Sequence, residues 1–139
     1  MTLKILLVED NEMNRDMLSR RLYRKGYHMI LAEDGQQGIE LALSVSPDVI
    51  LMDMNLPIID GWQATKTIRK HEKPLGKHTP IIAVTSHAMT SDQEKAINAG
   101  CDHYEPKPIN LDQLIEKIEL LHATFQSKNA EKSCDETQP

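Results

Sequence analysis

The chain has 139 residues, with 16 basic and 21 acidic side chains and a formal net charge of −5. This length fits one domain, and the negative charge argues against a surface that binds nucleic acid directly. No apolar stretch approaches the ~20 residues that span a bilayer, and Cys101 and Cys134 are the only cysteines, so we expect a cytoplasmic protein with neither membrane insertion nor a disulfide framework.

Five short segments are predicted to be strands. They cover residues 4–8, 28–32, 49–53, 81–85 and, with a weaker pattern, 103–105. Most of these segments are nearly continuous apolar runs, as expected of strands that helices cover on both faces. Each strand is followed by a helical pattern, and this alternation predicts an α/β fold with a parallel sheet.

The helices are predicted at about 12–25, 35–45, 61–70, 91–99 and from 111 onward. Gly26 and Gly100 are placed to end the first and fourth helices in a left-handed conformation. Ser91 and Glu94 resemble a capping box at the start of the fourth helix. Residues 126–139 are polar without apolar periodicity, so we predict a folded domain over 1–125 and a disordered tail over 126–139.

Polar side chains stand at the carboxyl ends of the predicted strands. Glu9 and Asp10 follow the first strand, Asp53 closes the third, Thr85 closes the fourth, and Lys107 follows the fifth. Parallel sheets bind ligands in the crevice outside these ends, so we expect the five groups to meet there. Such a set suits the metal-assisted transfer of a phosphoryl group onto a carboxylate.

The electrostatics of three neighbouring carboxylates favour a bound cation. At ~5 Å each pair repels by about 3 kcal/mol with an effective dielectric constant of ~20, which raises the pKa values of the group. Mg²⁺ suits oxygen ligands of this kind. Each residue also has a simpler interpretation, such as an acidic helix start, a loop cap or a solvated lysine, but their joint order favours a site.

Several segments resemble the receiver domain of two-component response regulators. They are LLVEDN at 6–11, LMDMNLP at 51–57, DG at 60–61, AVT at 83–85 and KP at 107–108. The resemblance covers about residues 3–122. The chain is similar to the stand-alone members of the family, which consist of a single receiver domain. It implies a flavodoxin-like (βα)5 fold, a doubly wound parallel sheet with strand order 2-1-3-4-5.

The resemblance also implies the roles of the acidic residues. Asp53 would be the phosphoacceptor. Glu9 and Asp10 would hold Mg²⁺ with Asp53, and Asp10 would be the more direct ligand, since the family more often has Asp where this chain has Glu9. Asn55 would add its backbone carbonyl to the metal site.

The remaining roles concern charge and switching. Lys107 would pair with the phosphoryl group, and the Lys107–Pro108 peptide bond is typically cis in the family. Thr85 would donate its hydroxyl to the phosphoryl group and move inward, coupled to Tyr104, so that the fourth helix, fifth strand and fifth helix report the state. The alternative is that Tyr104 is a static strand residue. His87 and Asn55 would flank the path of attacking water.

The implied function is a phosphoacceptor switch in a two-component system or phosphorelay. The donor would be a histidine kinase or a histidine phosphotransfer protein, docked on Asn14, Met17, Pro108 and Ile109. Ile109 has an equally good interpretation as a core residue. Because the chain ends soon after the last helix, we expect output through a downstream protein and no DNA-binding or catalytic output domain.

Two other functions remain open on the sequence. A phosphohydrolase of the haloacid-dehalogenase type also forms an aspartyl phosphate, but it needs a second Asp where this chain has Asn55. A pseudo-receiver would fold and bind partners without phosphorylation. We expect a regulatory domain with slow self-dephosphorylation, not an enzyme.

Overall fold

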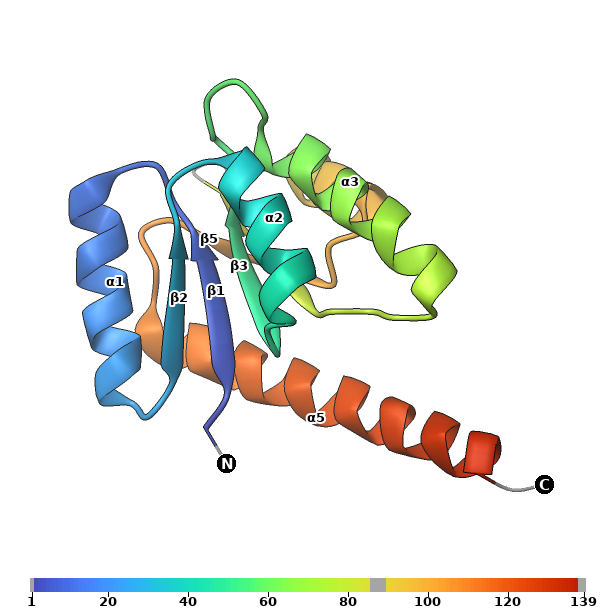
Figure 1. Ribbon diagram of the computed structural model, residues 1–139. Helices are drawn as coiled ribbons and strands as arrows, with labels where there is room; N and C mark the ends of the chain where they lie inside the picture. Colours follow the sequence, from blue (N-terminus) through green and yellow to red (C-terminus); the bar gives the residue numbers. More distant parts are fainter. Residues whose placement is uncertain (1, 86–89, 138–139) are drawn as a thin grey trace.

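The computed structural model describes residues 2–85 and 90–137, with the side chains of 90–93 and 125–137 left aside. Five parallel strands form one sheet in the order β2-β1-β3-β4-β5 (Figure 1). The strands are β1 Lys4–Val8, β2 His28–Ala32, β3 Val49–Asp53, β4 Ile81–Thr85 and β5 His103–Pro106. This order confirms the predicted flavodoxin-like fold.

Helices follow each strand. They are α1 Glu12–Arg24, α2 Gly35–Val45, α3 Gly61–Glu72 with a 3₁₀ turn at Lys73–Leu75, α4 Thr90–Ala99 and α5 Leu111–Thr137. Asn11, Asp34, Asp60 and Asn110 each accept a hydrogen bond from a backbone N–H in the first turn of α1, α2, α3 and α5. These caps satisfy amide groups that the helices leave free, and they fix where each helix leaves the sheet.

Two apolar cores lie on opposite faces of the sheet. The first, the α2–α3–α4 core, contains Leu6, Val8, Ile50, Met52, Ile39, Ala64, Ile68 and Ala96 among others. The second, the α1–α5 core, contains Ile5, Leu7, Val49, Leu51, Leu18, Leu22, Leu114 and Ile118 among others. Successive strand residues alternate between the cores because side chains of a strand point to opposite faces.

The helix ends agree with most of the predicted breaks. Gly26 and Gly100 have φ values of +99° and +114° and follow α1 and α4, as predicted. The predicted capping box at the start of α4 involves the Ser91 side chain and lies outside the described part. None of the helices within the described residues is long and apolar enough to cross a membrane.

The helix α5 overlaps the C-terminal segment that we predicted to be a disordered tail over 126–139. The backbone of α5 is helical as far as Thr137. Its Gln, Lys, Ala and Glu residues are good helix formers, a property that a search for apolar periodicity does not count. The division of the chain at residue 125 stays a prediction.

A charged network ties the helices to the amino end of the sheet. The Arg69 guanidinium donates to the carbonyls of Gly100 and Thr79 and to the carboxylates of Glu72 and Asp102 at 2.6–2.9 Å. Asp102 also accepts the backbone N–H at the start of β4. The network therefore anchors α3, β4 and β5 at the end opposite to the polar strand ends.

Candidate functional site

The three predicted carboxylates meet at the carboxyl end of the sheet. β1 and β3 are neighbours with Val8 opposite Met52, so the residues that follow them emerge side by side. One carboxylate oxygen from each of Glu9, Asp10 and Asp53 lies within 4.8 Å of the others. Glu9 and Asp53 are buried and Asp10 is exposed, so the cluster opens to solvent on one side.

Lys107 supplies the positive charge at this cluster. Its Nζ lies 3.1 Å from Asp53 Oδ2 and 3.6 Å from Glu9 Oε1. The backbone N–H of Lys107 donates to the carbonyl of Thr85, which ties the loop after β5 to the end of β4. The Lys107–Pro108 peptide bond is cis, as the family resemblance implied.

Backbone groups orient the carboxylates. The N–H of Asn55 donates to Asp53 Oδ1 at 2.9 Å, and the N–H of Asn11 donates to Glu9 Oε2 at 3.4 Å. Asp53 therefore has one oxygen on a backbone amide and the other on an ammonium group. Such charge-assisted contacts hold a carboxylate in one orientation.

The electrostatics of the cluster favour the binding of a cation. Burial of the Glu9 carboxyl, together with its hydrogen bond and charge repulsion with Asp53, raises its pKa from 4.5 to about 7, against the opposing effects of Lys107 and the Asn11 N–H. One ammonium thus does not neutralise three carboxylates. The donor set consists of oxygens, which a small hard cation such as Mg²⁺ prefers, so these residues fit that ion.

The predicted switch residues lie on adjacent strands. Thr85 is buried at the end of β4, and β5 places Tyr104 opposite Ala83. Tyr104 is half-buried against the α2–α3–α4 core. Residue 87, predicted to flank the path of water, lies outside the described residues.

Two basic residues near the site were missed by the sequence analysis. Arg15 donates to the backbone carbonyl of Glu9 at 2.8 Å and lies 3.8 Å from Glu33. Lys117 on α5 donates to the carbonyl of Tyr104 and to the buried carboxylate of Glu105 at 2.8 and 2.7 Å. Each contact joins a helix to the strand before it, and no local pattern distinguishes these cations from solvated ones.

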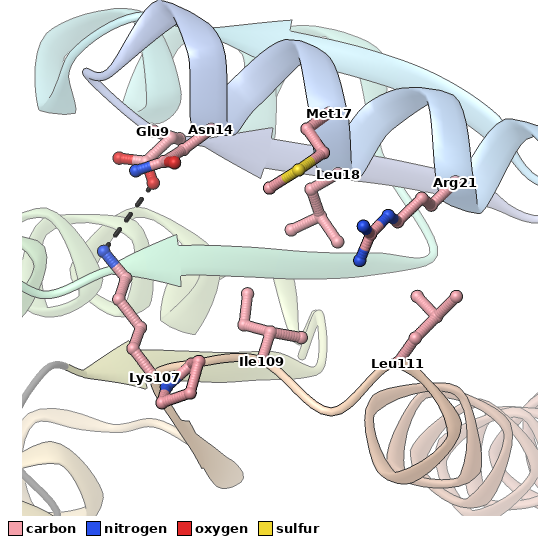
Figure 2. Close-up of a pocket in the computed structure, with 9 residues that line it drawn as sticks. Glu9, Asn14, Met17, Leu18, Arg21, Lys107, Ile109 and Leu111 are labelled. Carbon is pink, nitrogen blue, oxygen red and sulfur yellow. Dashed lines mark ion pairs between the residues drawn. The ribbon is translucent and has the colours of Figure 1, made fainter.

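A groove of about 520 Å³ extends from the acidic cluster between α1 and the loop after β5. Figure 2 shows Glu9 and Lys107 at one end and Arg21 and Leu111 at the other. Asn14, Met17, Pro108 and Ile109, the predicted docking residues, all line it, together with Leu18, which was not predicted. Ile109 also packs against the α1–α5 core, which agrees with its interpretation as a core residue, and its docking role stays a prediction.

Known proteins are similar to this chain in sequence and in fold. The sequence model of the response regulator receiver domain matches residues 5–119. The chain is 39% identical to hybrid signal transduction histidine kinase I of Dictyostelium discoideum over 94% of its own length but only 8% of that protein. It is 38% identical to the polar-differentiation response regulator DivK of Brucella abortus, over 85% of this chain and 94% of DivK.

Two similar solved structures contain a metal ion or a partner protein. The receiver domain of the sensor histidine kinase PA1611 from Pseudomonas aeruginosa, with magnesium coordinated in its active-site cleft, has a TM-score of 0.80 and 36% identity over 88% of this chain and 99% of that one. The second structure is that of the Ssk1 receiver domain, crystallised with the phosphotransfer protein Ypd1 of Saccharomyces cerevisiae. It matches with a TM-score of 0.78 and 33% identity, over 84% of this chain and 86% of that one.

Proposed function

The chain belongs to the response regulator receiver family, and from this premise we propose that Asp53 accepts a phosphoryl group from a histidine of a partner protein. The observation that carries the assignment is the contact of Lys107 Nζ with Asp53 Oδ2 at 3.1 Å inside a cluster of three carboxylates. Both Asp53 and Glu9 meet the ammonium and a backbone amide, but the contacts of Asp53 are shorter, at 3.1 and 2.9 Å against 3.6 and 3.4 Å for Glu9. Asp53 is therefore the carboxylate whose orientation is best defined.

The proposed reaction forms a P–O bond and breaks a P–N bond. A carboxylate oxygen of Asp53 attacks the phosphorus of the phosphohistidine, and the electron pair of the broken bond passes to the imidazole nitrogen, which takes up a proton. The Lys107 ammonium neutralises charge on the transferring group, the main means of catalysis in such reactions. The Asn55 N–H keeps the acceptor carboxylate in place throughout.

We propose Mg²⁺ as the cofactor, held by Glu9, Asp10, Asp53 and the backbone carbonyl of Asn55. When bound, it would neutralise negative charge on the phosphoryl oxygens and on the cluster. The three carboxylate oxygens within 4.8 Å of one another support this assignment, and the raised pKa of Glu9 agrees with it, since a cation would stabilise a carboxylate that burial and the neighbouring Asp53 destabilise. The magnesium ion coordinated in the receiver of PA1611 is consistent with it.

The output of the switch would be a change in protein contacts. Thr85 would donate its hydroxyl to the acyl phosphate and move inward, and the Tyr104 ring would rotate toward the vacated space. A phosphoryl group can shift an equilibrium only through contacts that differ between the two states. The half-buried position of Tyr104 next to β4 supports it as the group that changes the surface.

The donor would be a histidine kinase or a histidine phosphotransfer protein docked in the groove. Asn14, Met17, Pro108 and Ile109 would contact it, because they border the route to Asp53. The match to Ssk1, which is seen with Ypd1, favours a partner of this class. A cytoplasmic location completes the proposal, in keeping with the free, buried Cys101 thiol.

One experiment separates this function from its alternatives. Purified protein is incubated with Mg²⁺ and acetyl phosphate, weighed intact by mass spectrometry and mapped by peptide analysis. A single phosphoryl adduct on Asp53 supports the switch. Rapid hydrolysis of acetyl phosphate without an adduct favours a phosphohydrolase, and no reaction favours a pseudo-receiver or a switch that accepts phosphate only from a kinase. An adduct on another residue would refute the assignment of Asp53.

A further inference from the structure

Arg15 on α1 is largely withdrawn from water. Its side chain is 12% exposed, whereas that of Arg20, on the same helix, is 71% exposed. A guanidinium group that gives up water must find other acceptors, because burying an unpaired charge is costly. Arg15 finds them in the loops that follow β1 and β2, at the edge of the sheet that carries the acidic cluster.

The first contact of Arg15 fixes the backbone of the acidic pair. Its Nη1 donates to the carbonyl oxygen of Glu9 at 2.8 Å. This carbonyl belongs to the peptide unit that joins Glu9 to Asp10, and the N–H of Glu9 donates to the carbonyl of Ala32 at 3.1 Å. Because a peptide unit is planar, it cannot turn and carry Asp10 away from the cluster without breaking the bond to Arg15.

The second contact orients the guanidinium group. Nη2 of Arg15 lies 3.8 Å from Oε1 of Glu33, in the loop after β2. The N–H of Glu33 in turn donates to Oε1 of Gln37 on α2 at 2.9 Å. Glu33 is 66% exposed, so this ion pair adds little stability. Its effect is geometric, because the planar fork of an arginine that is held on one side aims its other donors.

The acidic cluster needs support of this kind from outside. One carboxylate oxygen from each of Glu9, Asp10 and Asp53 lies within 4.8 Å of the others, and these groups repel one another when they are ionised. A second basic side chain bound to these oxygens would compete with a metal ion for them. Arg15 instead takes a backbone carbonyl, which leaves the carboxylate oxygens of Glu9 to the ion.

We propose that Arg15 is a positioning residue for Mg²⁺, and that its bond to the Glu9 carbonyl holds Glu9 and Asp10 where they bind the ion. The inference rests on the proposed function, in which this acidic pair holds Mg²⁺ with Asp53. Groups that hold metal ligands from outside typically change the metal affinity about 10- to 100-fold when they are removed. Since Arg15 acts through the backbone of Glu9, it should set how tightly the ion binds and not the rate of phosphorylation at saturating Mg²⁺.

The charge of Arg15 gives the test a definite sign. Removing a positive charge beside a cation site would, by Coulomb forces alone, strengthen the binding of Mg²⁺. The positioning role requires the opposite, namely that the ion binds more weakly once the guanidinium group is gone. A variant that keeps both the charge and a donor for the Glu9 carbonyl should recover much of the affinity.

Four variants test this role. Arg15→Met keeps the apolar stem and removes the donors, and Arg15→Gln, with a shorter neutral side chain, takes its place should the first variant not fold. Arg15→Lys keeps the charge and a single donor. Arg20→Met is the matched control, because Arg20 lies on the same helix and pairs with Asp16 at 3.2 Å. For each protein we would measure the Mg²⁺ dissociation constant from amide NMR shifts, the melting temperature in EDTA, and the rate of labelling by acetyl phosphate.

The positioning role predicts a defect that Mg²⁺ itself repairs. Arg15→Met and Arg15→Gln should bind Mg²⁺ about tenfold more weakly than the wild type, Arg15→Lys should lie nearer to the wild type, and Arg20→Met should be unchanged. Labelling of Arg15→Met should be slow at low Mg²⁺ and should reach the wild-type rate once the weaker site is saturated. A merely structural contact would lower the melting temperature in EDTA but leave the dissociation constant of the folded protein unchanged.

Four results would overturn the role of Arg15. They are Mg²⁺ binding by the folded Met or Gln variant that is as tight as in the wild type or tighter, a loss in Arg15→Lys as large as in Arg15→Met, an equal loss in Arg20→Met, and labelling that stays slow at saturating Mg²⁺. Any of these in a protein whose wild type binds Mg²⁺ and takes phosphate at Asp53 leaves the proposed function standing. Wild-type protein without Mg²⁺-dependent shifts around the acidic cluster would refute the proposed cofactor as well, so the two failures can be told apart.

Discussion

Replacing Glu9 by glutamine should stabilise the metal-free protein at pH 8 and leave it nearly unchanged at pH 5. The folded protein raises the pKa of this carboxyl from 4.5 to about 7, chiefly through burial and the neighbouring Asp53. A raised carboxyl pKa means that the folded state favours the neutral form. Glutamine has the size of the protonated acid and is neutral at every pH.

The magnitude follows from proton linkage. The pKa of Glu9 is higher in the folded protein than in the unfolded chain. Glu9 therefore contributes stability that is fully present below about pH 4.5 and is lost as the pH rises through about 7. Between pH 5 and pH 8 the loss amounts to roughly 2.5 kcal/mol at most. Water at the open side of the cluster lowers this figure, so we expect a change of between about 1 and 2.5 kcal/mol.

The assay is urea unfolding of wild type and Glu9→Gln in EDTA, at half-unit steps from pH 5 to pH 8.5. The difference between the two curves isolates Glu9, because every other titrating group is common to both proteins. The wild type should fall progressively below the variant as the pH rises. A difference that stays constant across this range would mean that Glu9 does not change its charge there, and the reasoning would be wrong.

Adding Mg²⁺ should remove or reverse the difference. The cation stabilises the ionised carboxylate, and any ligand that binds only the folded state raises its stability. Wild-type protein at pH 8 should therefore gain more from 10 mM Mg²⁺ than Glu9→Gln does. Equal gains in both proteins would place the ion away from Glu9.

Four further substitutions test the rest of the site. Asp53→Asn should abolish the acetyl phosphate adduct while leaving the fold intact, because it removes the nucleophilic oxygen; an adduct of unchanged yield would refute the acceptor assignment. Asp10→Ala should eliminate the rise in melting temperature on adding Mg²⁺, and an unchanged rise would place the metal elsewhere. Met17→Glu should slow transfer from a phosphorylated histidine domain at least tenfold with normal acetyl phosphate labelling, whereas normal transfer would exclude the groove as the docking surface. Thr85→Ala should still accept phosphate, but its amide NMR shifts near Tyr104 should no longer respond to beryllofluoride; a response like that of the wild type would separate Tyr104 from Thr85.

The strands and their polar ends could be predicted from the sequence because they obey local rules. A short apolar run followed by an acid or a hydroxyl marks both a buried parallel strand and the place where it emerges. Glu9, Asp10 and Asp53 were identified in this way, and Lys107 was identified by its place after the weaker fifth strand. The structure brings their charged groups together. The strand order itself came from the family resemblance, since no local pattern encodes it.

Features that depend on packing between distant segments were not predictable. The bond from Arg15 to the Glu9 carbonyl and the bonds of Lys117 require the folded positions of other elements. The left-handed backbone of Ile58 runs against the preference of its own side chain.

The two cores place the proposed docking groove and the proposed switch residue on opposite faces of the sheet. Ile109, in the groove, packs against the α1–α5 core, whereas Tyr104, only five positions earlier, packs against the α2–α3–α4 core. Lys117 on α5 crosses this division, because it donates to the carbonyl of Tyr104 and to the carboxylate of Glu105. A substitution at Lys117 would therefore disturb both faces at once, although this side chain lies outside the acidic cluster.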